Sequence, residues 1–120
     1  MKELLIQILE SFGYPVKLQG SLGQDEKYPE SFFTFWNNSA NDGSHYDNDA
    51  INYIWDFTVY FYSTSPQLVN TVLLEAKKLL KQSGFIASGK GYDVPSDEPT
   101  HTGRAIDVLK IENQEVNEND

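Results

Sequence analysis

Apolar residues recur with helical spacing in two segments of the chain. In residues 2–12 they are followed by Gly13 and Pro15, which stop a helix. In residues 66–82 they form one stripe, Ser65 is a natural N-cap, and the proline that follows it suits the first helical position. The pattern predicts two amphipathic helices, and each needs an apolar surface to pack against.

Residues 51–62 instead alternate with the period of a β-strand, so that their side chains point to two opposite faces. One face is apolar and predicts the core, with Trp55 inside it. Its members are Ile51, Tyr53, Trp55, Phe57, Val59 and Phe61. The other face mixes aromatic and polar side chains and carries Asn52, Ile54, Asp56, Thr58, Tyr60 and Tyr62. A half-aromatic outer face is typical of a surface that meets a partner.

The remaining segments complete an α+β domain. We expect further strands at 15–18, 31–36, 85–87 and 103–111, and loops at 19–30, 37–49 and 88–102. An antiparallel sheet with two helices packed on one face accommodates this order and leaves the other face open. We expect one domain over residues 1–112, followed by an acidic, disordered tail at 113–120.

Composition narrows the possible functions. The 120 residues carry 18 acids against 9 bases, a formal charge of −9, which opposes binding to a nucleic-acid backbone. Without cysteine, the fold needs no oxidising compartment. The first ten residues are too short and too polar for a signal peptide or a membrane span, so we expect a cytosolic protein without membrane contact.

We expect no metal, no cofactor and no catalysis. The 37–49 segment is rich in Asp and Asn, but it lacks the ligand spacing of a calcium-binding loop. The two histidines, His45 and His101, have no nucleophile or orienting group nearby in the sequence. The alternative is a small enzyme that uses His101 with Asp97 or Asp107, and it predicts a pocket gathering these side chains.

The interface candidates lie on the outer face of the central strand and in the loop before it. Arg104 is the only arginine, and its planar head suits a bidentate contact with a carboxylate of the same subunit or of a neighbour. We expect it to join Asp56, Tyr60 and Tyr62 in a contact between subunits. The polar loop residues His45, Tyr46 and Asp47 are the candidates for a second partner.

Over most of residues 1–112 the chain resembles the tail terminator and tail-completion proteins of long-tailed phages and prophages. The resemblance rests on the short leading helix, the aromatic strand from Tyr53 to Phe61, the helix from Pro66 to Gln82 with the Ser-Gly-Phe that follows it, and the Thr-His-Thr-Gly-Arg-Ala-Ile-Asp-Val-Leu stretch from Thr100.

This resemblance implies a virion protein, present in the host cytoplasm during assembly. It would form a ring, a hexamer, on the last ring of the tail tube and present a surface to the head connector or stopper protein. A head-tail adaptor or another neck component would fit the same residues. A third possibility is an acidic decoy that binds a basic host protein, which requires an organised negative surface.

Overall fold

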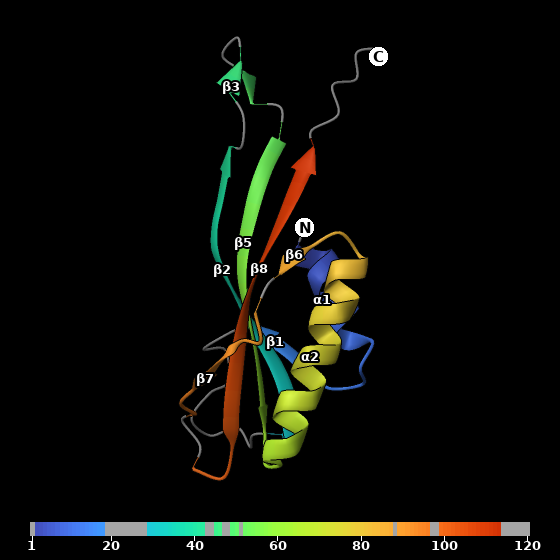
Figure 1. The fold of residues 1–120 in the computed structure, drawn as a ribbon, viewed down its shortest axis with the longest axis vertical. Helices are drawn as coiled ribbons and strands as arrows, with labels where there is room; N and C mark the ends of the chain where they lie inside the picture. The colour runs from blue at the N-terminus through green and yellow to red at the C-terminus, as the bar shows by residue number, and fades with distance from the viewer. Residues whose placement is uncertain are drawn as a thin grey trace.

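The computed structural model of the chain describes residues 2–18, 29–42, 45–46, 49–50, 52–87, 89–96 and 99–113. Two helices and six strands build the domain, and a small hairpin extends it (Figure 1). The elements are α1 (Lys2–Glu10), β1 (Val16–Leu18), β2 (Ser31–Asp42), β3 (His45–Tyr46), β4 (Asp49–Ala50), β5 (Asn52–Ser63), α2 (Pro66–Gln82), β6 (Ile86–Ala87), β7 (Tyr92–Val94) and β8 (Thr102–Asn113).

The six strands of the main sheet follow the order β1-β2-β5-β8-β6, and β7 also pairs with β8. All of these pairs are antiparallel except β1 with β2, which run parallel. The predicted α+β class and the largely antiparallel sheet are therefore confirmed, with one parallel edge as a correction. The connection from Leu18 at the end of β1 to Ser31 at the start of β2 is long enough to join two parallel strands.

Both helices lie on one face of the sheet, which we call the inner face (Figure 1). Leu5 and Leu9 of α1 and Leu73 and Leu80 of α2 are buried against that face. The cap of α2 is the one that the sequence predicts, because the Ser65 hydroxyl accepts a hydrogen bond from the Leu68 amide at 3.4 Å. Helix α1 ends at Glu10, slightly before the predicted end.

The central strand β5 divides its side chains between the two faces in the way that the alternation predicts. Phe57, Val59 and Phe61 are fully buried under the helices, and the ring centroids of Phe33 and Phe61 are 4.7 Å apart. Trp55 stacks on Phe57 at 6.0 Å but is only partly buried. The deepest part of the core is therefore further along the strand than Trp55, since the helices cover that part of β5.

The predicted loop at 37–49 is wrong in its first half. Strand β2 continues to Asp42 and pairs with β5 as far as Tyr53, with one irregularity between Asn37 and Ser39. Its Asn and Ser residues are turn formers, but a long partner strand provides the hydrogen bonds that outweigh this preference. As a result, β2, β5 and β8 extend beyond the helices as a three-stranded arm (Figure 1).

A similar correction applies to the segment before the last strand. The predicted loop at 88–102 contains β7, whose residues pair with Gly103, Arg104 and Ala105 of β8. Strand β8 then runs the full length of β5, from Thr102 beside Ser63 to Asn113 beside Asn52. Residues 114–120, which make up nearly all of the predicted acidic tail, lie outside the described residues.

Candidate functional site

The face of the sheet opposite the helices, here called the outer face, carries large apolar side chains that are exposed. Their exposed fractions range from 36% to 52%, and they come from β2, β6, β7 and β8. They are Trp36, Ile86, Tyr92, Leu109 and Ile111. Several exposed apolar groups on one sheet face are typical of a protein contact surface.

A row of hydrogen-bonded polar side chains crosses this face. Asn38 donates from its amide nitrogen to the Thr58 hydroxyl at 2.8 Å and to an Asp56 carboxylate oxygen at 3.2 Å. Thr58 donates to Asp107 at 2.8 Å, and the Tyr92 hydroxyl donates to the same carboxylate oxygen at 3.1 Å. The row ties β2, β5, β8 and β7 together, so the surface is held in one shape before any partner binds.

The Tyr92 hydroxyl is a neutral donor held beside a carboxylate. Partial burial raises the pKa of Tyr92 above its ordinary value, and the negative charge of Asp107 and its hydrogen bond raise it further. The phenol therefore keeps its proton and continues to donate to Asp107 throughout the neutral range.

A hollow of about 410 Å³ opens beside this polar row. Asp56 and Asp107 supply carboxylates to its lining, Asn38 supplies an amide, and Ile86 and Leu109 supply apolar walls. Two carboxylates between apolar walls suit a cationic group on an aliphatic stem, because the stem and the charge each meet a matching surface.

The structure separates the predicted outer-face candidates. Asp56 is partly buried at the hollow, and Tyr60 is partly buried and stacks on Tyr62 with the ring centroids 6.1 Å apart. Tyr62 itself is buried, and its other neighbour is Phe32, whose ring centroid is 5.3 Å away. Tyr62 is therefore packed inside the subunit, while Asp56 and part of Tyr60 remain accessible.

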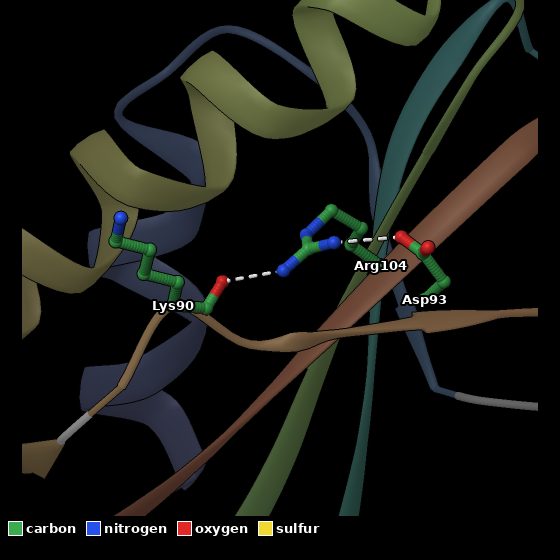
Figure 2. A network of polar contacts seen from close by, with 3 residues as sticks. All are labelled: Lys90, Asp93 and Arg104. Atoms are coloured by element: carbon green, nitrogen blue, oxygen red, sulfur yellow. Dashed lines mark hydrogen bonds and ion pairs between the residues drawn. The ribbon is translucent and has the colours of Figure 1, made fainter.

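Arg104 does not join this group, which corrects the expectation that it pairs near Asp56. It lies opposite Phe61 in the register between β5 and β8, so it projects on the inner face with Ile106 and Val108. Its guanidinium donates to Asp93 of the same subunit at 2.7 Å and to the Lys90 carbonyl at 2.8 Å (Figure 2). The expected carboxylate partner of Arg104 could belong to the same subunit or to a neighbour, and in the structure it is Asp93 of the same subunit.

The structure does not bring His101 to Asp107, one of its two predicted partners. His101 is buried, its Nε2 lies 2.7 Å from the Pro29 carbonyl, and its Nδ1 lies 3.0 Å from the Thr100 hydroxyl. Asp107 is six residues further along an extended strand, a separation of about 20 Å. Asp97 and Asp47 lie outside the described residues, as do the side chains of His45 and Tyr46, whose backbones form β3.

The described residues lack two further features. They contain no cluster of three or more His, Asp or Glu side chains placed to hold a metal ion. Among these same residues, no helix has the length and apolar character that crossing a membrane requires.

Sequence reasoning overlooked most of the outer surface. Leu109 and Ile111 alternate with the buried Ile106 and Val108, so the period of this strand could have placed them on the open face. Trp36 was expected at the end of a strand, and its position at the middle of a longer one gives it neighbours on β5. Tyr92 had no such signal, because β7 is only three residues long.

Comparison of the chain with protein-family models gives no match, and comparison with curated proteins gives no significant match.

Proposed function

We propose that this chain is a structural assembly protein of a tailed phage or prophage, and specifically the tail terminator. In this role it caps the last ring of the tail tube, stops tube growth and presents a surface to the head connector or stopper protein. The role is carried out in the host cytoplasm during assembly and in the virion tail afterwards. It requires no catalysis, metal, membrane or nucleic-acid contact.

The observation that carries the proposal is the exposed apolar outer face, held rigid by its polar row. Trp36 remains 48% exposed and Leu109 36% exposed, although the same chain buries an aromatic core on its inner face. A protein that functions alone in water gains nothing from a rigid apolar surface, whereas a subunit covers it on assembly. The resemblance in the sequence supplies the particular assembly, a homo-oligomeric ring of six copies.

The test uses purified tail tube protein from the same phage. Wild-type chain added during polymerisation should shorten the tubes and halt their growth, as measured by electron microscopy. The Trp36→Ser and Leu109→Ser double variant should keep its circular dichroism spectrum and fail to stop growth. Leu18→Ser is the matched control, since Leu18 is 44% exposed on the edge strand β1, away from the proposed surface.

The same proteins separate the terminator from the adaptor. A terminator changes tube length in the absence of heads. If tube length is unaffected and the chain binds only the connector, the terminator proposal is wrong and the adaptor function replaces it.

A further inference from the structure

Acidic and basic side chains are unevenly distributed between the two sides of the described sheet. The described outer-face side chains of β2, β5 and β8 include the acids Asp56 and Asp107 and no base. In the sequence, no lysine or arginine occurs between Lys27 and Lys77. Six of the nine bases instead lie in or after the second half of α2, and those on α2 are on the helix side of the sheet.

Helix α2 presents these bases away from the core. Lys78 is exposed on the side opposite the buried Leu73, Ala76 and Leu80, and Lys81 is exposed one turn later. Lys77 is engaged within the subunit, because its ammonium donates to the Gly89 carbonyl. Glu75 is also exposed, but it lies on the opposite flank of the helix from Lys81. Among the lysines of α2, Lys78 and Lys81 are therefore the two available to another molecule.

The hollow on the outer face has the chemistry to accept such a lysine. Its carboxylates on Asp56 and Asp107 match the ammonium, and Ile86 and Leu109 offer apolar walls to the methylene stem. The Asp107 carboxylate is already oriented by Thr58 and Tyr92, so it does not have to be ordered when the lysine arrives.

We propose that the hollow receives Lys78 or Lys81 from α2 of a second copy of this chain, so that subunits join head to tail. This inference rests on the proposed function, since it describes how the ring is made. Because the hollow and the lysines lie on opposite sides of one subunit, each copy can use both at once. In such a heterologous contact, two different surfaces of the subunit meet, and successive copies form a ring when the rotations between them add up to a full turn. A contact between two identical surfaces would produce only a dimer.

Cross-linking tests the contact directly, because the chain has no cysteine of its own. Asn38→Cys marks the hollow, and Gln82→Cys marks the lysine side of α2; both positions are exposed, and the sheet separates them within one subunit. With a short bismaleimide reagent, the double variant should give a ladder of covalent oligomers. The two single variants should remain monomers when treated alone and give only dimers when mixed.

Charge exchange tests the chemistry. Asp56→Lys alone, or Lys78→Glu with Lys81→Glu, should weaken self-association at least tenfold in sedimentation, and mixing the two variants should restore it. The control Glu10→Lys makes the same charge change as Asp56→Lys, and the control Lys2→Glu reverses one lysine as each substitution on α2 does. Both lie at exposed positions of α1 and should leave self-association within twofold of wild type.

The outcomes separate this contact from the function on which it rests. Oligomers that fail to cross-link, single variants that cross-link to themselves, or charge variants that assemble normally overturn the head-to-tail contact and leave the terminator function standing. A chain that stays monomeric even on tail tubes, yet still stops their growth, overturns the ring. A chain that neither assembles nor stops growth overturns both proposals.

Discussion

The ring of Tyr62 lies against the backbone of Gly103, its direct neighbour across β5 and β8. A Cβ atom built on Gly103 would be 2.6 Å from two carbons of this ring and 3.0 Å from a methyl group of Val94. Real side chains do not approach this closely, so the space occupied by the aromatic ring requires glycine at this position.

Gly103→Ala should therefore destabilise the fold by about 1–3 kcal/mol, the usual cost of overpacking a closed site. The measurement is urea unfolding followed by fluorescence. Thr102→Ala, at the exposed neighbouring position, is the control and should cost less, because it removes only a long hydrogen bond to the Ser63 carbonyl, at 3.4 Å. Combining Gly103→Ala with Tyr62→Leu should recover part of the loss, and a purely additive double variant would contradict the steric explanation.

The two stacked aromatic residues of β5 should differ in their contribution to stability. Phe57→Ala removes a fully buried ring and should cost about 3–5 kcal/mol. Trp55→Ala should cost less, about 1–2 kcal/mol, because the indole is only partly buried. Denaturant unfolding of both variants checks this order, and equal losses would show that the arm buries Trp55 more fully than the described fold does.

Alkaline pH should weaken the fold through Tyr92. Its pKa is raised in the folded state, so the folded chain holds this proton more tightly than the unfolded chain does. The contribution to stability is complete below the ordinary value of 10.0 and is lost as the pH rises through the folded pKa. Between about pH 9 and pH 11, the unfolding free energy should fall more steeply for wild type than for Tyr92→Phe. Parallel slopes would argue against the Asp107 contact.

Arg104→Lys should loosen the β7 segment without unfolding the domain. A lysine ammonium cannot hold the Asp93 carboxylate and the Lys90 carbonyl in the same planar arrangement. Since the Asp93 side chain is 85% exposed, the global loss should be at most about 1 kcal/mol. Amide hydrogen exchange should speed up in residues 90–94 and stay constant in β5. Asp93→Asn is the matched variant, and unchanged exchange in both would mean that backbone pairing alone holds β7.

The sequence was sufficient to predict the layers of the fold, because strand and helix periods are local signals. The alternation in β5 assigned Phe57, Val59 and Phe61 to the core, and the cap at Ser65 marked the start of α2. It was not sufficient for the length of β2, since Asn37 and Asn38 favour turns unless a partner strand is present.

The candidate site, too, could be predicted only in part from the sequence. Asp56 was identified because it interrupts an aromatic strand, and it does line the hollow. The apolar walls of the hollow, Ile86 and Leu109, lie opposite each other on β6 and β8. The sequence alone does not show this pairing, so it could not place them beside Asp56. Arg104 was expected beside Asp56 on the outer face, but it shares the period of the buried Ile106 and Val108 and lies on the inner face.

The order of strands in the sheet has a consequence for when this protein can fold during synthesis. Strand β8 is the last of the described elements, yet it lies between β5 and the short strands β6 and β7, which have no other described strand partner. Until it is made, the core lacks Ile106 and Val108, and one side of β5 is unpaired. The sheet therefore cannot be completed until β8 has been synthesised and has left the ribosome, and up to that point β5 keeps an unpaired edge.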